Sequence, residues 1–324
     1  MHRAPTSLLA MHRYLAQRIV LVIPTLLGVS VVVFALVRLL PGDAVTMLLQ
    51  DYAYAKDADE MRARLGLDRP VYVQYADWLG GIVRGDLGTS LRSKTPVGEE
   101  LASRIPVTVE LGALALLIGL AVAIPIGVVS AVRQDTAADY LGRSAAIGML
   151  AIPSFWLGTL VITLPSIWWG WTPPLRYSHL LDDPAKNLAH VVVPAAILGL
   201  GLSGALMRLT RAQMLEVLRQ DFVRTATAKG LGEQAVVFRH ALKNAFIPVL
   251  TLLGLQVSIL VSGTVVLESV FVLPGMGRYL LEAVQYRDYP VIQALNLLFA
   301  TVIVLANLAV DLLYGWLDPR VRYG

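Results

Sequence analysis

The sequence predicts an all-α polytopic membrane protein with six transmembrane helices and both termini on the cytoplasmic side. Of the 324 residues, 56% are hydrophobic and only 15% are charged, whereas soluble domains carry about a quarter charged residues. Apolar stretches long enough to cross a bilayer, about 20 residues each, recur six times along the chain. We therefore expect lipid to surround most of this chain.

The six apolar stretches lie at residues 18–40, 107–132, 144–169, 190–209, 247–267 and 291–316. Pro153 and Pro165 fall in the third stretch and Pro194 in the fourth. Prolines are tolerated in membrane helices where neighbouring helices satisfy the freed backbone groups. Small residues in the fourth stretch, among them Gly199 and Gly204, predict close packing between helices.

Basic residues predict the orientation, because short cytoplasmic loops carry an excess of Lys and Arg. Segment 208–246 holds seven basic residues against three acidic ones, and both chain ends are basic, whereas loops 170–189 and 268–290 hold two basic residues each. We therefore place both termini and the 208–246 loop in the cytoplasm. Residues 1–17 are then a cytoplasmic segment, and residues 41–106 form an extracytoplasmic loop with short helices.

An amphipathic helix is predicted within this outer loop, over residues 71–83. Its apolar side chains recur at helical spacing: Val71, Tyr75, Trp78, Leu79 and Ile82. One interpretation is a helix that rests on the membrane surface or on the helix bundle. The alternative is part of a docking surface for an external protein.

Several kinds of chemistry are missing from the sequence. Cysteine is absent, which excludes disulfides and thiolate sites, and no G-x-x-x-x-G-K-[ST] phosphate loop is present. Glu110 and Asp311 lie towards span ends and not at the membrane centre, which argues against an ion-coupled transporter. The histidines lack metal-ligand spacing, and the basic residues lack interleaved aromatics. We expect no catalytic residue, cofactor or metal in this chain, and contact with membrane lipid but not with nucleic acid.

The tetrapeptide Gly201-Leu202-Ser203-Gly204 resembles the G-x-S-G motif of rhomboid intramembrane proteases. A serine nucleophile needs a base, and rhomboids supply a histidine from their sixth span. Residues 291–316 contain no histidine. We therefore interpret the small residues of this motif as a helix-packing face.

The loop between the fourth and fifth spans is the most informative segment. An apolar face predicts a helix over residues 212–229, and a second apolar stripe, from Val236 to Phe246, runs into the fifth span. Gly230 and Gly232 can supply the turn between them, because glycine adopts positive φ without steric cost. Small side chains before the turn favour insertion into a partner's groove. The alternative is an ordinary basic loop that only sets topology.

The chain from about residue 11 to its end resembles the dipeptide/oligopeptide/nickel group of permeases in bacterial ABC importers. The matching blocks follow the order of the family: Tyr14–Arg18, Ile23–Thr25, Leu40–Asp43, Gly85–Gly88, Pro106–Thr108, Phe222–Leu231, Arg239–Asn244, Leu273–Gly277, Arg287–Pro290 and Leu317–Tyr323. Each block is weak alone, but their order along the whole chain makes the resemblance specific.

The loop is similar to the cytoplasmic EAA loop of these permeases, with departures. Ala226 and Gly230 agree with the general pattern, whereas Arg224 and Thr225 stand in place of Glu and Ala, and Lys243 replaces a proline. These departures are typical of the peptide/nickel group. An ion pair that depends on the missing Glu cannot be carried over to this chain.

The resemblance implies a type I ABC importer permease fold, with residues 107–324 as the core transmembrane domain and 211–246 as its EAA-like loop. The expected ATPase-coupling residues are Arg224, Thr225, Ala226, Ala228, Lys229, Gly230 and Gly232. The implied partners are a second homologous permease, two ATP-binding cassette ATPase subunits that bind ATP and Mg, and an extracytoplasmic substrate-binding protein.

The resemblance also implies a multi-pass protein of the bacterial inner membrane that is not itself an enzyme. Short peptides are the expected cargo, with nickel chelates or oligosaccharides as alternatives; an ion-coupled secondary transporter is the alternative of a different class. The spans contain no charged side chain placed to bind a peptide terminus. Specificity is therefore expected to reside in the external binding protein.

Overall fold

The computed structural model describes residues 6–39, 63, 66–174 and 176–317. The chain divides into two compact units, Met1–Val107 with Pro274–Leu305, and Thr108–Leu273 with Ala306–Gly324. Throughout the described residues the regular elements are helices, together with one isolated antiparallel bridge between Thr89 and Pro96. The two units are described separately below.

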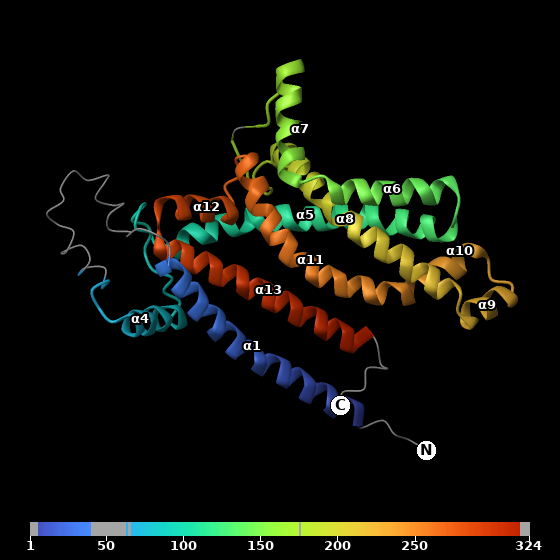
Figure 1. The fold of residues 1–324 in the computed structure, drawn as a ribbon, viewed down its shortest axis with the longest axis horizontal. Coiled ribbons are helices and arrows are strands. Elements are labelled where there is room, and N and C mark those ends of the chain that lie inside the picture. Colours follow the sequence, from blue (N-terminus) through green and yellow to red (C-terminus); the bar gives the residue numbers. More distant parts are fainter. Residues whose placement is uncertain (1–5, 40–62, 64–65, 175, 318–324) are drawn as a thin grey trace. The chain divides into compact units, whose positions relative to one another are not determined.

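Each unit is built from long helices (Figure 1). The first contains α1 (Thr6–Leu39), α4 (Val71–Val83), α12 (Met276–Tyr286) and the adjoining parts of α5 (Val97–Val132) and α13 (Tyr289–Leu317). The second contains the remainder of α5 and α13 with α6 (Ala137–Ala151), α7 (Ser154–Trp169), α8 (Pro184–Leu218), α9 (Asp221–Ala228), α10 (Glu233–Ala235), the π-helical stretch η2 (Val236–Leu242) and α11 (Lys243–Val270).

Among the described residues, five helical segments are long and apolar enough to cross a membrane, and the pair α6 and α7 makes a sixth if it counts as one bent span. These segments coincide with the six apolar stretches of the sequence. The helices are longer than the stretches: α5 begins at Val97, and α8 runs from Pro184 to Leu218. Hydropathy marks the membrane-embedded part of a helix and does not mark its polar continuation.

The third apolar stretch is not one continuous helix. α6 ends at Ala151, α7 begins at Ser154, and their axes differ by 90° (Figure 1). Pro153 accounts for the break, because proline lacks an N–H and disfavours helical backbone in the residue before it. Ile152 accordingly has extended backbone, with φ −92° and ψ 117°. Pro165 and Pro194, by contrast, lie within α7 and α8.

Small residues hold α5, α6 and α8 close together in the second unit. A Cβ atom at Gly199 would lie 2.5 Å from the Ala115 carbonyl oxygen of α5, and one at Gly204 would lie 2.8 Å from the Ala146 oxygen of α6. Only glycine allows such backbone approach. The predicted packing face of the fourth span is therefore confirmed, although Gly201 has open space around its Cβ position.

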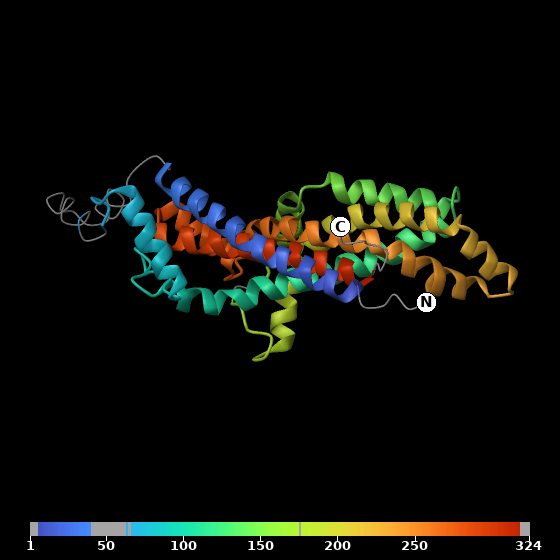
Figure 2. The ribbon, with the colours of Figure 1, turned by 90° about the horizontal axis from the view of Figure 1, so that it is seen from below.

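In the first unit, α4 lies beside the C-terminal end of α1 (Figure 2). The rings of Tyr75 and Trp78 pack on Phe34 with centroid distances of 5.2 and 5.6 Å, and the Tyr75 hydroxyl shares a 2.8 Å hydrogen bond with Ser30. The predicted helix over residues 71–83 is thus present, and it rests on a helix of the bundle. Val71, which belongs to the predicted apolar face, is exposed.

Candidate functional site

The segment that the sequence singled out forms a short helix, α9, and not the continuation of α8. α8 ends at Leu218, Gln220 has extended backbone (φ −78°, ψ 152°), and α9 begins at Asp221. The expected single helix over residues 212–229 is therefore wrong. Apolar spacing cannot reveal this break, because apolar residues occur on both sides of it. Val217 is buried at the end of α8, and Val223 is buried at the start of α9.

Gly230 ends α9 in a Schellman motif, in which a residue with left-handed backbone caps the last carbonyls of a helix. Gly230 has φ +80°. Its N–H donates to the Thr227 oxygen at 2.9 Å, and the Leu231 N–H donates to the Ala226 oxygen at 3.4 Å. Gly232 has φ −61°. The positive φ of the predicted turn is therefore supplied by Gly230.

α9 has one buried face, which fixes it to the second unit. Val223 and Ala226 are buried in an apolar cluster that contains residues of α5, α8, η2 and α11. The other members of this anchoring cluster are Val128, Ala131, Met214, Val217, Val236, Val237, Ala241 and Ala245. Ala226, predicted as a partner-contacting residue, is thus directed into the protein. Its small side chain lets the helix approach the cluster closely.

The opposite face of α9 is exposed and carries Arg224, Thr225, Ala228 and Lys229. Arg224 forms an ion pair with Asp221 at 3.1 Å, and both side chains are exposed, so this pair contributes little to stability. The exposed face is therefore basic and small, and it lies at the tip of the second unit (Figure 2).

Two exposed apolar side chains flank this basic face and were not predicted as site residues. Phe222 is 39% exposed and Leu231 is 42% exposed. A single helix over residues 212–229 places Phe222 on its apolar face, and the break at Gln220 removes it from that face. Aromatic side chains and arginine are enriched in protein interfaces. The exposed face of α9 is thus suited to docking a protein.

After α9 the chain returns to the membrane through a widened helix. Residues Val236–Leu242 form a π-helical stretch that leads into α11. Val236, Val237 and Ala241 are buried in the anchoring cluster, whereas Phe238, predicted on the same stripe, is exposed. The π-helix changes the angular spacing of its side chains, which explains why a stripe of ordinary helical period misplaces Phe238.

The residues of the protease-like motif serve packing. Ser203 is fully buried, and its hydroxyl donates to the Leu200 oxygen of its own helix at 2.7 Å. Its side chain also contacts the Met149 sulfur at 3.1 Å. These partners hold the serine in the α6–α8 contact. In the described parts of the chain no group of three His, Asp or Glu side chains is placed to hold a metal ion.

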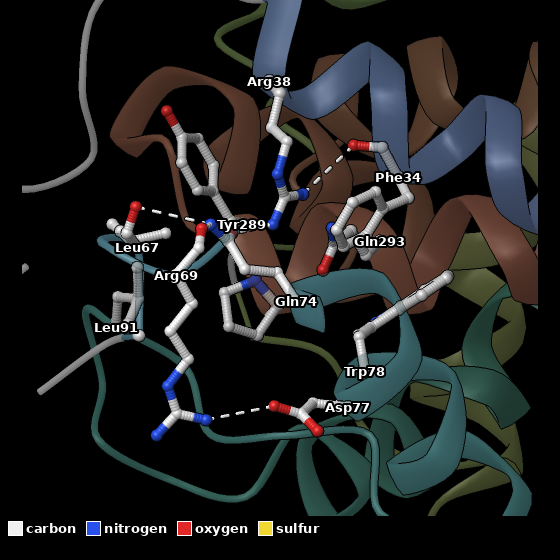
Figure 3. A pocket seen from close by; sticks show the side chains of 12 residues that line it. Phe34, Arg38, Leu67, Arg69, Gln74, Asp77, Trp78, Leu91, Tyr289 and Gln293 are labelled. Atoms are coloured by element: carbon white, nitrogen blue, oxygen red, sulfur yellow. Dashed lines mark hydrogen bonds and ion pairs between the residues drawn. The ribbon is translucent and has the colours of Figure 1, made fainter. Parts of the chain in front are cut away.

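A second candidate site is a cavity of about 340 Å³ in the first unit, beside α4 (Figure 3). Its wall combines aromatic, basic and acidic side chains: Phe34, Arg38, Leu67, Arg69, Gln74, Asp77, Trp78, Leu91, Tyr289 and Gln293. The Arg38 guanidinium lies 3.4 Å from the Phe34 ring centroid and donates to Gln74 Oε1. Arg69 and Asp77 form an ion pair at 3.2 Å. Most of these residues belong to segments 41–106 and 268–290, which are predicted to face outwards, whereas Phe34, Arg38 and Gln293 belong to the predicted spans.

Comparison with known families decides the identity of the chain. Residues 123–323 match the family described as binding-protein-dependent transport system inner membrane component, and residues 11–112 match the N-terminal domain of the same kind of component. The chain belongs to this family. It is therefore a multi-pass inner-membrane permease of an ABC importer, a transport subunit whose family implies ATPase and binding-protein partners.

Two relatives cover nearly the whole permease. The dipeptide transport system permease protein DppB of Escherichia coli K12 is 40% identical over 337 residues, which cover 97% of this chain and 99% of the relative. The dipeptide transport system permease protein DppB of Alkalihalophilus pseudofirmus is 38% identical over 330 residues, which cover 96% and 99%. The similarity extends through both units.

Proposed function

We propose that this permease forms half of the pathway through which short peptides enter the cell. Both relatives named above are dipeptide permeases, and their similarity spans nearly the entire chain, which supports the same class of cargo. No observation favours nickel chelates or oligosaccharides. An ion-coupled secondary transporter is not favoured either, because the chain belongs to a binding-protein-dependent family.

The other half of the pathway is a second, homologous permease in our proposal. Two ATPase subunits bind ATP and Mg and hydrolyse the nucleotide on the cytoplasmic side, where residues 1–17, the EAA-like loop 211–246 and the C-terminus lie. An extracytoplasmic protein delivers the peptide to the side that residues 41–106 face. The mixed-charge cavity beside α4, which this loop lines together with residues of α1 and α13, is the site best suited to contact that protein.

The exposed face of α9 is the docking site for an ATPase subunit. Arg224, Thr225, Ala228 and Lys229 contact the ATPase, and Ala226 anchors the helix from behind. Gly230 makes the turn that returns the chain to the membrane, and Gly232 follows it in the same loop with ordinary backbone. One observation carries this proposal: α9 exposes one face and buries the other in a cluster shared with α5, α8 and α11. A displacement of α9 is therefore passed to these helices as a rigid-body movement.

Purification of the tagged permease from its native membrane in mild detergent, with mass spectrometry of the proteins that accompany it, tests the proposal. We expect a second six-span permease and two ATPases with phosphate loops. Peptide uptake in proteoliposomes that contain the complex, the binding protein and ATP then tests the cargo. Recovery of the chain alone, active in ion-driven uptake, would overturn the assignment of partners.

A further inference from the structure

A buried polar cluster occupies the second unit at one end of α8, outside the coupling segment. It contains Glu110 of α5, Tyr177 of the loop before α8, and Asn187 and His190 of α8. The Tyr177 hydroxyl donates to Glu110 Oε2 at 2.9 Å, and Asn187 Nδ2 donates to the same oxygen at 3.1 Å. Asn187 Nδ2 also donates to the Ser178 carbonyl at 3.0 Å. The two N–H groups of Asn187 Nδ2 are thus satisfied within the protein.

Three buried acceptor atoms of this cluster have no hydrogen-bond partner among the described residues: Glu110 Oε1, Asn187 Oδ1 and His190 Nδ1. Asn187 is 0% exposed and His190 is 1% exposed. His190 Nε2 lies 3.1 Å from the Phe271 carbonyl oxygen, which only accepts, so Nε2 carries a proton. In the tautomer of the neutral ring with its proton on Nε2, Nδ1 is an acceptor. A buried polar atom without a partner is costly and calls for an explanation.

The missing partner has to be a donor, and a positively charged one is favoured. One of the three acceptors is a carboxylate oxygen, and among the described contacts of Glu110 the donors are the neutral Tyr177 and Asn187. Burial, together with the Glu110 carboxylate, raises the pKa of Tyr177, so its hydroxyl keeps its proton and stays a donor to Oε2. The negative charge of Glu110 is therefore left for an external cation.

We propose that this cluster binds a primary ammonium group. Such a group offers three N–H donors and one positive charge, which match three acceptors and one carboxylate. Glu110 and Tyr177 are only partly buried, whereas Asn187 and His190 are buried. The ammonium belongs to a free amine or to a peptide N-terminus, and the second source rests on the proposed function. The expectation that the spans hold no charge for a peptide terminus is then incomplete.

The test uses the purified permease complex and the probe methylammonium chloride, with tetramethylammonium chloride at equal ionic strength as the matched salt. Both cations carry one charge, but only methylammonium has N–H donors. We expect methylammonium alone to raise the melting temperature of the complex in a saturable way. Glu110→Gln removes the charged acceptor and should weaken this binding at least tenfold, because hydrogen bonds to charged groups contribute more than neutral ones.

Glu99→Gln is the control variant, since Glu99 is exposed on the same helix, and it should bind methylammonium as the natural chain does. His190→Phe, which keeps an aromatic ring but removes the acceptor, is the second variant if Glu110→Gln does not assemble. It too should weaken the binding. An equal response to both salts, or an undiminished response in Glu110→Gln and His190→Phe, would overturn the proposal.

Uptake by the same preparations distinguishes the two sources of the ammonium. With binding protein saturated by a dipeptide, slower uptake in Glu110→Gln than in Glu99→Gln supports the peptide N-terminus as ligand. Unchanged uptake with lost methylammonium binding supports a free amine. If dipeptide uptake is normal but methylammonium has no effect on the natural chain, the proposed function stands and the ammonium site is wrong.

Discussion

Gly230 is the residue on which the shape of the coupling segment depends, because its φ of +80° costs a residue with a Cβ roughly 1–2 kcal/mol. Proline is excluded by its fixed φ of about −65° and by loss of the N–H that bonds Thr227. We expect Gly230→Pro to insert normally and to lower the peptide imported per ATP hydrolysed. Gly230→Asn should be milder, since asparagine tolerates left-handed backbone.

The measurement is uptake and ATP hydrolysis in the same proteoliposomes. Gly232→Ala is the control, because Gly232 has φ −61° and open space at its Cβ position. We expect this variant to import as much peptide per ATP hydrolysed as the natural chain. Normal uptake by Gly230→Pro would show that the turn has no coupling role.

Asp139 illustrates a different kind of residue, one that holds helices together behind the site. Its carboxylate is fully buried and accepts hydrogen bonds from Ser130, from the Asp135 N–H and from two nitrogens of Arg211, at 2.7 and 2.6 Å. Loss of one partner of a fully buried pair costs about 3–5 kcal/mol. Arg211 remains 20% exposed, so we expect Asp139→Asn to cost on the order of 2 kcal/mol, less than that range because of solvent screening.

Thermal unfolding of the purified chain in detergent measures this loss. Asp221→Asn, which breaks the exposed pair with Arg224, is the matched control and should change the melting temperature little. Equal melting temperatures for Asp139→Asn and the natural chain would show that the buried pair adds no net stability.

At the scale of elements, hydropathy predicts the spans well because burial in lipid demands long apolar runs. Hydropathy does not predict where a helix breaks within or beside an apolar stretch, because the backbone conformation of a single residue decides that. Pro153 interrupts an apolar stretch that would otherwise be one span, and the sequence does suggest this break. The break at Gln220 has no such signal, since no proline or glycine stands there. The positions of Phe222 and Phe238 could not be predicted, because both depend on local departures from the ordinary helical period.

The two faces of α9 allow ATPase docking and folding stability to be tested separately, because neighbouring side chains in this helix lie on opposite faces. Phe222→Ala removes an exposed ring and should weaken capture of the ATPase subunit without changing the melting temperature. Val223→Ala removes two methyl groups from the anchoring cluster and should cost roughly 1–3 kcal/mol of stability. Pull-down of the ATPase and thermal unfolding, measured on both variants, check the assignment. A lower melting temperature with normal ATPase capture in Phe222→Ala would contradict this assignment and place Phe222 on the anchoring face.

At the scale of the whole molecule, the orientation in the membrane decides which partner each site can meet. The exposed face of α9 can meet an ATPase only from the cytoplasm, and the cavity beside α4 can meet a binding protein only from outside. Positive-inside charge predicts this arrangement, and the absence of cysteine makes it directly measurable, because any cysteine introduced is the only thiol of the chain.

We expect Thr225→Cys, on the exposed face of α9, to react with a membrane-impermeant maleimide only in inside-out vesicles. Ser93→Cys, in the predicted outer loop, should react in intact spheroplasts, because residues 41–106 are predicted to face outwards and Ser93 is exposed. Both residues lie outside the apolar spans, so labelling reports sidedness and not burial, and the natural chain serves as the unlabelled control. Reaction of Thr225→Cys from outside would invert the topology and remove α9 as an ATPase-docking site.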